Sequence, residues 1–308
     1  MKCKPIPSLF AVLILLASSS GLSSPDSPKK KDDIDLKDLV RRAAAKLQAR
    51  KSLSLNYTYL AHCVYFRFDT RIKYTTPNNA DYEIMFIEGE QYMHQLKQDG
   101  LPLSPEQERR DTALREAFAK ERREGTLKRG ELLPTYTFLE LPFERLADEF
   151  TLHAKGKQPM DGREVQVIDA FPRDTGEASG DDQETARHFK FKLWVDTSEA
   201  QVVKVQATVI KDIAWTRILT IIAPNADNRP AVAQQMRTLY KRGTIVTVEW
   251  TKLPDGAWLP KHCYVKAPQR IWTNVSHQRS SQPWLDVLDW TYSDYKRFRV
   301  DTRIVPQS

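Results

Sequence analysis

Histidine and cysteine are the residue types in this sequence that could hold a metal ion or act as nucleophiles. The chain has six histidines and three cysteines, and they meet in two dipeptides, His62-Cys63 and His262-Cys263. Four such ligands could bind a tetrahedral zinc ion. In a strand, however, neighbouring side chains point to opposite faces, so the two members of one dipeptide do not easily share an ion. We therefore expect no metal site and no cofactor.

The cysteines of these dipeptides, Cys63 and Cys263, could instead form a disulfide if the protein is exported to an oxidising compartment. The third cysteine, Cys3, lies at the N-terminus, in a segment that export would remove. Because the pair is far apart in the sequence, nothing local brings the two Cα atoms within bonding range. A disulfide and two free thiols both remain open.

No residue pattern typical of a catalytic site is found in the sequence. The histidines never occur at HExxH or HxH spacing, and Ser179 in Gly176–Gly180 lies one place too late for a nucleophile elbow. The sequence has no glycine-rich loop of the kind that binds phosphates. We expect no catalytic residue and a protein that is not an enzyme.

The N-terminus has the three parts of an export signal. Lys2 and Lys4 precede an apolar run from Ile6 to Leu16, and small residues follow up to Ser24. Such a run is too short to anchor the chain in a bilayer. We expect residues 1–22 to be a cleaved signal peptide, residues 23–32 a flexible leader, and the mature protein to be soluble.

The charge balance indicates a mild preference for anionic partners. The formal net charge is +7 and the isoelectric point is about 9.2. Lipid head groups and acidic polymers are partners of this kind, and peripheral contact with a membrane stays open. Export, together with the absence of a recognised binding motif, argues against nucleic acid.

An amphipathic helix is expected to follow the leader, from Asp33 or Asp35 to about Lys51. Apolar residues recur there at three- and four-residue steps, which is typical of a helix with one buried stripe. The basic residues, among them Arg50, are assigned to the opposite, solvated face.

A second helix is expected over 105–125, and a short one over 142–149. Ser104 and Gln107 form a capping box, and Pro105 suits the first helical position. Because the helix is almost wholly charged, we expect it on the surface. There it could contact an envelope protein through Arg109, Arg115 and Arg122.

Most of the remaining chain has the alternating pattern of strands. Such patterns occupy residues 64–68, 165–168, 189–195, 202–209, 244–250 and 258–267. Clean alternation predicts antiparallel strands with one buried face. We find no internal repeat and no linker, so residues 33–308 are expected to form one domain of the α+β class, mainly β.

Several short motifs resemble those of a known family. They are Gly89-Glu90-x-Tyr92, Asp99–Ser104, Leu193–Asp196, Trp258–Lys261 and Tyr292–Tyr295. Together they resemble the bacterial exported proteins of the outer-membrane lipoprotein-sorting (LolA-like) superfamily, in an uncharacterised branch. The resemblance covers about residues 36–305. It implies a half-open, curved antiparallel β-barrel with helices covering the concave face, in a periplasmic protein.

The resemblance also implies that the concave face binds acyl chains of lipids or lipoproteins, as a carrier or a sensor. An acyl chain gains about 0.8 kcal/mol per buried methylene, so such binding needs no catalytic group. The alternative is a filled core and a protein-interaction or regulatory module of the envelope without lipid cargo. The residues expected to line the cavity are apolar and come from the predicted strands: Val64, Phe66, Phe68, Phe86, Phe189, Phe191, Leu193, Val203, Val205, Val246, Val248, Trp250 and Trp258.

Overall fold

The structure is a computed structural model that describes residues 35–69, 77–88, 90–124, 143–173, 186–212, 241–275 and 278–298. The predicted signal peptide (1–22) and leader (23–32) lie outside these ranges, as does the serine of Gly176–Gly180.

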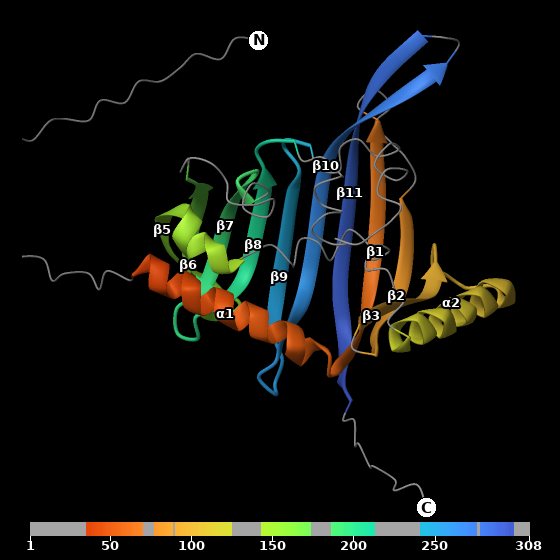
Figure 1. Cartoon of the computed structure of the whole chain (residues 1–308), viewed down its shortest axis with the longest axis horizontal. Coiled ribbons are helices and arrows are strands. Elements are labelled where there is room, and N and C mark those ends of the chain that lie inside the picture. Colours follow the sequence, from red (N-terminus) through yellow and green to blue (C-terminus); the bar gives the residue numbers. More distant parts are fainter. Residues whose placement is uncertain are drawn as a thin grey trace, which may run out of the picture. The chain divides into compact units, whose positions relative to one another are not determined.

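Eleven strands form one sheet in which every neighbouring pair is antiparallel (Figure 1). Its order is β4-β3-β2-β1-β11-β10-β9-β8-β7-β6-β5. The strands are β1 (Tyr57–Asp69), β2 (Asn78–Ile87), β3 (Glu90–Gln98), β4 (Leu101–Pro102), β5 (Phe150–Met160), β6 (Arg163–Pro172), β7 (Phe189–Asp196), β8 (Gln201–Val209), β9 (Ile245–Lys252), β10 (Trp258–Val275) and β11 (Gln278–Arg297).

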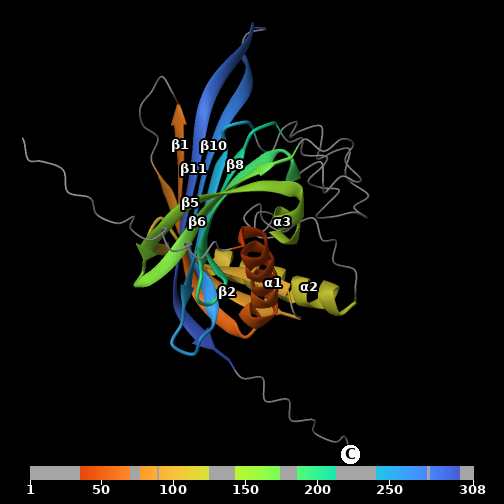
Figure 2. The ribbon, with the colours of Figure 1, turned by 90° about the vertical axis from the view of Figure 1, so that its left-hand side faces the viewer.

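The chain builds the sheet from the middle outward and then from one edge back to the middle. Strands β1 to β4 step toward one edge, the chain crosses to β5 at the other edge, and β5 to β11 return until β11 pairs with β1. The sheet is curved and does not close, since β4 and β5 do not meet (Figure 2). The expected fold class, a mainly β, half-open antiparallel sheet, is confirmed.

The strand register divides the sheet into two faces. Residues directly opposite each other on neighbouring strands share a face. Leu193, Val205, Val248, Cys263, Trp290 and Cys63 are linked in this way across six strands. We refer to the face that carries this row as the inner face and to the opposite one as the outer face.

Helix α1 (Leu36–Ser54) packs on the inner face, where it contacts β5, β8 and β10 (Figure 2). Asp35 caps it by accepting hydrogen bonds from the backbone N–H groups of Lys37 and Asp38. Its apolar stripe is buried, with Leu39 and Ala43 each 1% exposed. A 3-10 turn (Phe143–Arg145) and the short helix α3 (Leu146–Glu149) pack against α1, which agrees with the helix expected over 142–149.

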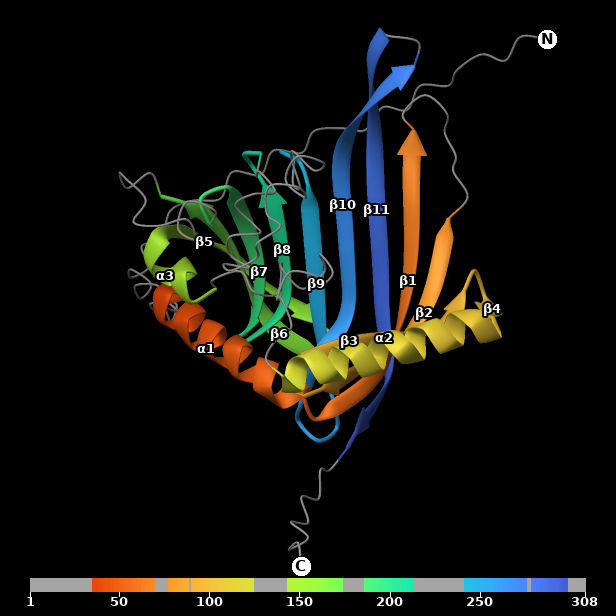
Figure 3. The ribbon, with the colours of Figure 1, turned by 45° about the vertical axis from the view of Figure 1, so that its right-hand side comes forward.

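Helix α2 (Pro105–Arg123) lies against β3 and has no buried side chain (Figure 3). The predicted capping box between Ser104 and Gln107 is present. Asp111 holds the helix to the strand, because it accepts from the Tyr92 hydroxyl and lies 2.6 Å from Nδ1 of His94. Since Tyr92 and His94 pair with outer-face residues of β2, this helix contacts the outer face of β3.

Candidate functional site

The inner face of strands β6 to β9 is closed by the helices. Phe191 lies at its centre, with ring centroids 6.1 Å from Phe143 and 5.5 Å from Phe150. We refer to this region as the helix-covered half. Its residues are all buried: Ile168, Ala170, Phe189, Phe191, Leu193, Val205, Ala207, Val209, Val246 and Val248.

The inner face of β1, β2 and β11 differs from the helix-covered half in its residue types and in how far its side chains are buried. Polar-tipped aromatic residues dominate it, and Tyr65, Tyr82, Phe86 and Leu288 are only half-buried. We refer to this region as the aromatic half. Its residues are Tyr59, Ala61, Cys63, Tyr65, Tyr82, Ile84, Phe86, Leu288, Trp290 and Tyr292.

Rings in and beside the aromatic half contact one another in two groups. The Tyr59 centroid lies 5.8 Å from Tyr292 and 5.6 Å from Tyr295, and Tyr82 lies 5.5 Å from Trp290. Burial raises the pKa of Tyr82, Tyr292 and Tyr295 above the usual tyrosine value. The phenols of these three residues are therefore neutral, and the surface they form is amphipathic. Farther along β11 on the same face, the Asp286 carboxylate accepts a hydrogen bond from the Tyr65 hydroxyl at 3.0 Å.

Trp290 carries an indole N–H that is buried and has no hydrogen-bond partner among the described residues. The residue is 6% exposed. Burying a donor without an acceptor lowers the stability of the fold by about 1–3 kcal/mol. Such unpaired groups are therefore rare in native proteins.

The two cysteines flank this tryptophan as free thiols. Cys63 on β1 and Cys263 on β10 both pair with Trp290 on β11, so one strand separates them. Two strand spacings amount to about 9.6 Å between Cα atoms, whereas a disulfide needs less than about 7 Å. The disulfide that the sequence left open is absent. Burial raises the pKa of each thiol to about 12, with Asp289 as the second cause, so neither is a reactive thiolate.

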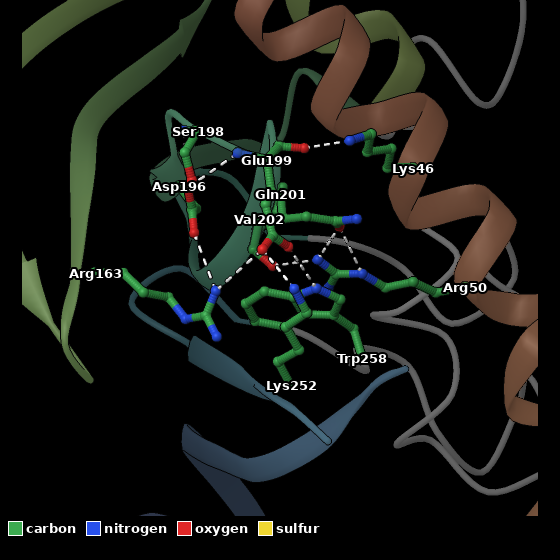
Figure 4. A network of polar contacts seen from close by, with 10 residues as sticks. All are labelled: Lys46, Arg50, Arg163, Asp196, Ser198, Glu199, Gln201, Val202, Lys252 and Trp258. Carbon is green, nitrogen blue, oxygen red and sulfur yellow. Dashed lines mark hydrogen bonds and ion pairs between the residues drawn. The ribbon is translucent and has the colours of Figure 1, made fainter. Parts of the chain in front are cut away.

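Near the end of α1, Arg50 is buried against Trp258 (Figure 4) and also against Trp250. It is 6% exposed, and its guanidinium carbon lies 4.9 Å from the ring centroid of Trp258 and 5.5 Å from that of Trp250. Its Nε and Nη2 donate to Oε1 of Gln201, and Nη2 also donates to the carbonyl of Val202 at 2.8 Å. Nη1 is buried without a hydrogen-bond partner in the described part of the chain.

Around Arg50 lies a group of charged side chains with more cations than anions. We refer to Lys46, Arg50, Arg163 and Lys252, with Asp196 and Glu199, as the basic cluster (Figure 4). Glu199 is bonded to Lys252 and lies 3.5 Å from Arg163, and Asp196 lies 3.3 Å from Arg163. Arg163 stacks on Trp258, with its guanidinium carbon 4.9 Å from the ring centroid, and its carboxylate partners among the described residues are Asp196 and Glu199.

Both carboxylates of the cluster are thus already neutralised, while Arg50 makes no ion pair with a described residue. Burial lowers the pKa of Arg50 to about 9, and only the charge of Glu199 opposes this shift. The hydrogen bond from Lys252 is the main cause that lowers the pKa of Glu199. The cluster can therefore accept additional negative charge, and Nη1 of Arg50 is a buried donor without an acceptor among the described residues.

Three of the six histidines have carboxylate partners on the side of the outer face. His62 is bonded to Asp81 at 2.5 Å, His94 to Asp111 at 2.6 Å and His262 to Asp289 at 2.6 Å. As expected for strands, His62 and Cys63 point to opposite faces. Within the described ranges, no three His, Cys, Asp or Glu side chains come together as metal ligands.

The thirteen residues expected to line one cavity do not share a face, which corrects that expectation. Val64, Phe66 and Phe68 alternate with the inner-face residues of β1 and so lie on the outer face, where the Phe66 and Phe68 rings stack at 5.9 Å. Phe86 lies in the aromatic half. Trp250 and Trp258 contact Arg50. The remaining seven are buried in or beside the helix-covered half: Phe189, Phe191, Leu193, Val203, Val205, Val246 and Val248.

Sequence reasoning missed Arg50 and Trp290. It placed Arg50 on the solvated face of the first helix, whereas the residue is buried. One signal could have found it: Arg50 follows Leu47 by three positions and so continues the apolar stripe. For Trp290 no local signal exists, because its unpartnered N–H depends on the neighbouring strands.

None of the helices in the described ranges combines the length and the apolar character that crossing a membrane requires.

No family model and no curated protein matches the amino-acid sequence. Solved structures with a similar but distant fold include a domain assigned to outer-membrane lipoprotein sorting from Vibrio parahaemolyticus (TM-score 0.35, 10% identity, 88% of this chain and 95% of that one). A LolA superfamily protein from Nitrosomonas europaea is similar with a TM-score of 0.31 and 9% identity, over 86% of this chain and 98% of that one.

A third similar structure is the complex of MucA and MucB from Pseudomonas aeruginosa, with a TM-score of 0.25 and 11% identity, over 86% of this chain and 99% of that one. The chain is thus structurally similar, at low TM-scores and low identity, to LolA-like proteins. Similarity of this degree says nothing about what the chain binds.

Proposed function

We propose that this chain is a non-enzymatic, exported protein that binds the acyl chain of a lipid or lipoprotein on its aromatic half, in the periplasm. The observation that carries the proposal is the set of half-buried, uncharged side chains on this part of the inner face: Tyr65, Tyr82, Phe86 and Leu288. Apolar and aromatic surface of this kind, with a few polar tips, is typical of sites for hydrophobic ligands.

The aromatic half is favoured over the helix-covered half because side chains of the protein's own helices already cover the latter. Phe191 is 4% exposed and Leu193 1% exposed, beneath α1 and the turn that carries Phe143. An acyl chain could enter there only by displacing packed side chains. On the aromatic half it would bury surface that the protein leaves partly open, at about 25 cal/mol per Å² of apolar area.

Native mass spectrometry of the mature protein, purified from the periplasm without detergent, tests this proposal. We expect a bound mass that organic extraction identifies as lipid or acylated protein. A mass equal to that of the protein alone, with no uptake of a fluorescent fatty acid, would contradict it.

The second candidate is a protein-interaction module that uses α2. Its support is that no side chain of this helix is buried, while Arg109 is exposed and Leu114 is 56% exposed. Arg115 and Arg122 are half-buried, so Arg109 is the better residue for charge reversal. A partner captured by the wild-type protein and lost with Arg109→Glu, but retained with Arg42→Glu on α1, would favour this candidate.

A further inference from the structure

The proposed function leaves the basic cluster without a role, and Arg50 is its unusual member. A buried guanidinium is normally paired with a carboxylate, because an uncompensated charge inside a protein is costly. Among the described residues, Arg50 has only neutral acceptors, the amide oxygen of Gln201 and the carbonyl of Val202. Arg163, by contrast, forms ion pairs with both Asp196 and Glu199, and its guanidinium also lies over the Trp258 ring.

One edge of the Arg50 guanidinium is buried without an acceptor among the described residues. Gln201 and Val202 occupy Nε and Nη2, and the tryptophan rings hold the plane of the group, so that Nη1 alone has no acceptor among the described residues. A planar fork fixed on one edge and stacked on aromatic rings is well prepared to bind an anion with the other edge.

The cluster adjoins the aromatic half through β10. Trp250, on which Arg50 stacks, pairs with Pro260, and the Pro260 carbonyl accepts a hydrogen bond from the hydroxyl of Tyr295. The Tyr295 ring in turn contacts Tyr59 of the aromatic half at 5.6 Å. A ligand on the aromatic half therefore has the basic cluster at one end of its site.

We propose that Arg50 binds the anionic head group, a carboxylate or a phosphate, of the amphiphile whose acyl chain lies on the aromatic half. This inference rests on the proposed function. Nη1 donates to the head group, and Trp250 and Trp258 keep the guanidinium in place. Lys252 and Arg163 neutralise Glu199 and so prevent it from competing for Arg50. Because Nη1 is closed to solvent, binding includes a shift of the last turn of α1, where Leu53 is 52% exposed.

The test compares three ligands with the same sixteen-carbon chain: palmitate, its methyl ester and palmitoyl lysophosphatidate. Each displaces a fluorescent fatty acid from the wild-type protein, from Arg50→Gln and from Arg41→Gln. Arg41 is the matched control, an exposed arginine of the same helix that pairs with Asp148 at 2.6 Å.

We expect the wild type and Arg41→Gln to bind at least one of the two anions about tenfold more tightly than the ester, a difference of about 1.4 kcal/mol. In Arg50→Gln this preference disappears while the affinity for the ester is unchanged. Which anion binds more tightly distinguishes a fatty acid from a phosphate-bearing lipid as the source of the head group.

Equal affinity of the wild type for all three ligands would overturn the inference and leave the proposed function intact. If none of the three displaces the probe and the probe itself does not bind, the proposed function fails and the inference fails with it. Circular dichroism checks that Arg50→Gln is folded. If it is not, the comparison of the three ligands on the wild type, which needs no variant, decides the question.

Discussion

The two halves of the inner face belong to the same sheet but differ in their side-chain types and in their burial. In the helix-covered half, aliphatic and phenylalanine side chains meet α1 and Phe143 and are almost completely buried. In the aromatic half, tyrosine and tryptophan replace them, several side chains remain half-buried, and the N–H of Trp290 has no partner among the described residues. The difference teaches that one curved sheet can supply a filled core on one side and a partly open aromatic surface on the other.

The largest expected effect is on the stability of the helix-covered half. Phe191→Ala should lower the free energy of unfolding by about 3–5 kcal/mol, because it removes a buried ring and leaves a cavity. Tyr82→Ala in the aromatic half should lower it by clearly less, since that side chain is half-buried. Urea denaturation of both variants measures the difference. Equal losses would mean that the two halves are packed alike.

A smaller effect is expected at Asp196, whose side chain is 2% exposed at the edge of the helix-covered half. Burial alone would raise the pKa of this carboxyl, but hydrogen bonds from Ser198, the Glu199 backbone and Arg163 lower it. The group is therefore more acidic in the folded protein than in the unfolded chain, and its stabilisation is present above about pH 4 and is lost as the pH falls through the folded-state value.

Asp196→Asn should accordingly cost about 1–3 kcal/mol at pH 7 and less at pH 3, because the carboxyl of the unfolded wild-type chain, with a pKa of about 3.9, is then mostly protonated. Denaturation at the two pH values measures both quantities. A loss that is the same at pH 3 as at pH 7 would show that the charge of Asp196 does not contribute.

Replacing the buried charge of Arg50 should change stability little. Arg50→Met removes the hydrogen bonds to Gln201 and Val202 but also the cost of an unpaired buried cation, so we expect a change within about 1 kcal/mol. Thermal unfolding at one protein concentration checks this. A loss of several kcal/mol in the free energy of unfolding would mean that Arg50 stabilises the fold, and would argue against a role in ligand binding.

The smallest effect concerns the two thiols that flank Trp290. Because both are buried with pKa values of about 12, Cys63 and Cys263 should react with a thiol reagent at pH 8 far more slowly than after unfolding in urea. Absorbance of the released product follows the reaction. Rapid labelling of Cys63 in the folded protein would show that the aromatic half opens more widely than its burial indicates.

Much of the architecture could be predicted from local patterns. The apolar stripe and Asp35 predicted α1, and Ser104 with Gln107 predicted α2 at its correct start. Alternation predicted strands such as β8, where Val203, Val205 and Val209 are buried. Strand β5 could not be predicted in this way because its residues from Lys155 to Gln158 are polar and exposed at the edge of the sheet.

The arrangement of the candidate site could not be predicted in the same way. Alternation shows that Phe66 and Tyr65 point to opposite faces, but only the pairing of β1 with β11 shows that Tyr65 shares a face with Leu288 and Trp290. The burial of Arg50 depends on Gln201, Trp250 and Trp258, which are about 150 to 210 positions away in the sequence. Contacts over such separations leave no periodic pattern.

The central claim is that an acyl chain binds the inner face of the aromatic half. Leu288 and Phe66 lie on neighbouring strands, are both half-buried, and point to opposite faces of the same part of the sheet. Titration of a fluorescent fatty acid into the wild type, Leu288→Asp and Phe66→Asp therefore tests the claim most directly. We expect Leu288→Asp to weaken binding at least tenfold and Phe66→Asp to leave it unchanged. Unchanged binding by a folded Leu288→Asp variant, or an equal loss in both variants, would contradict the account.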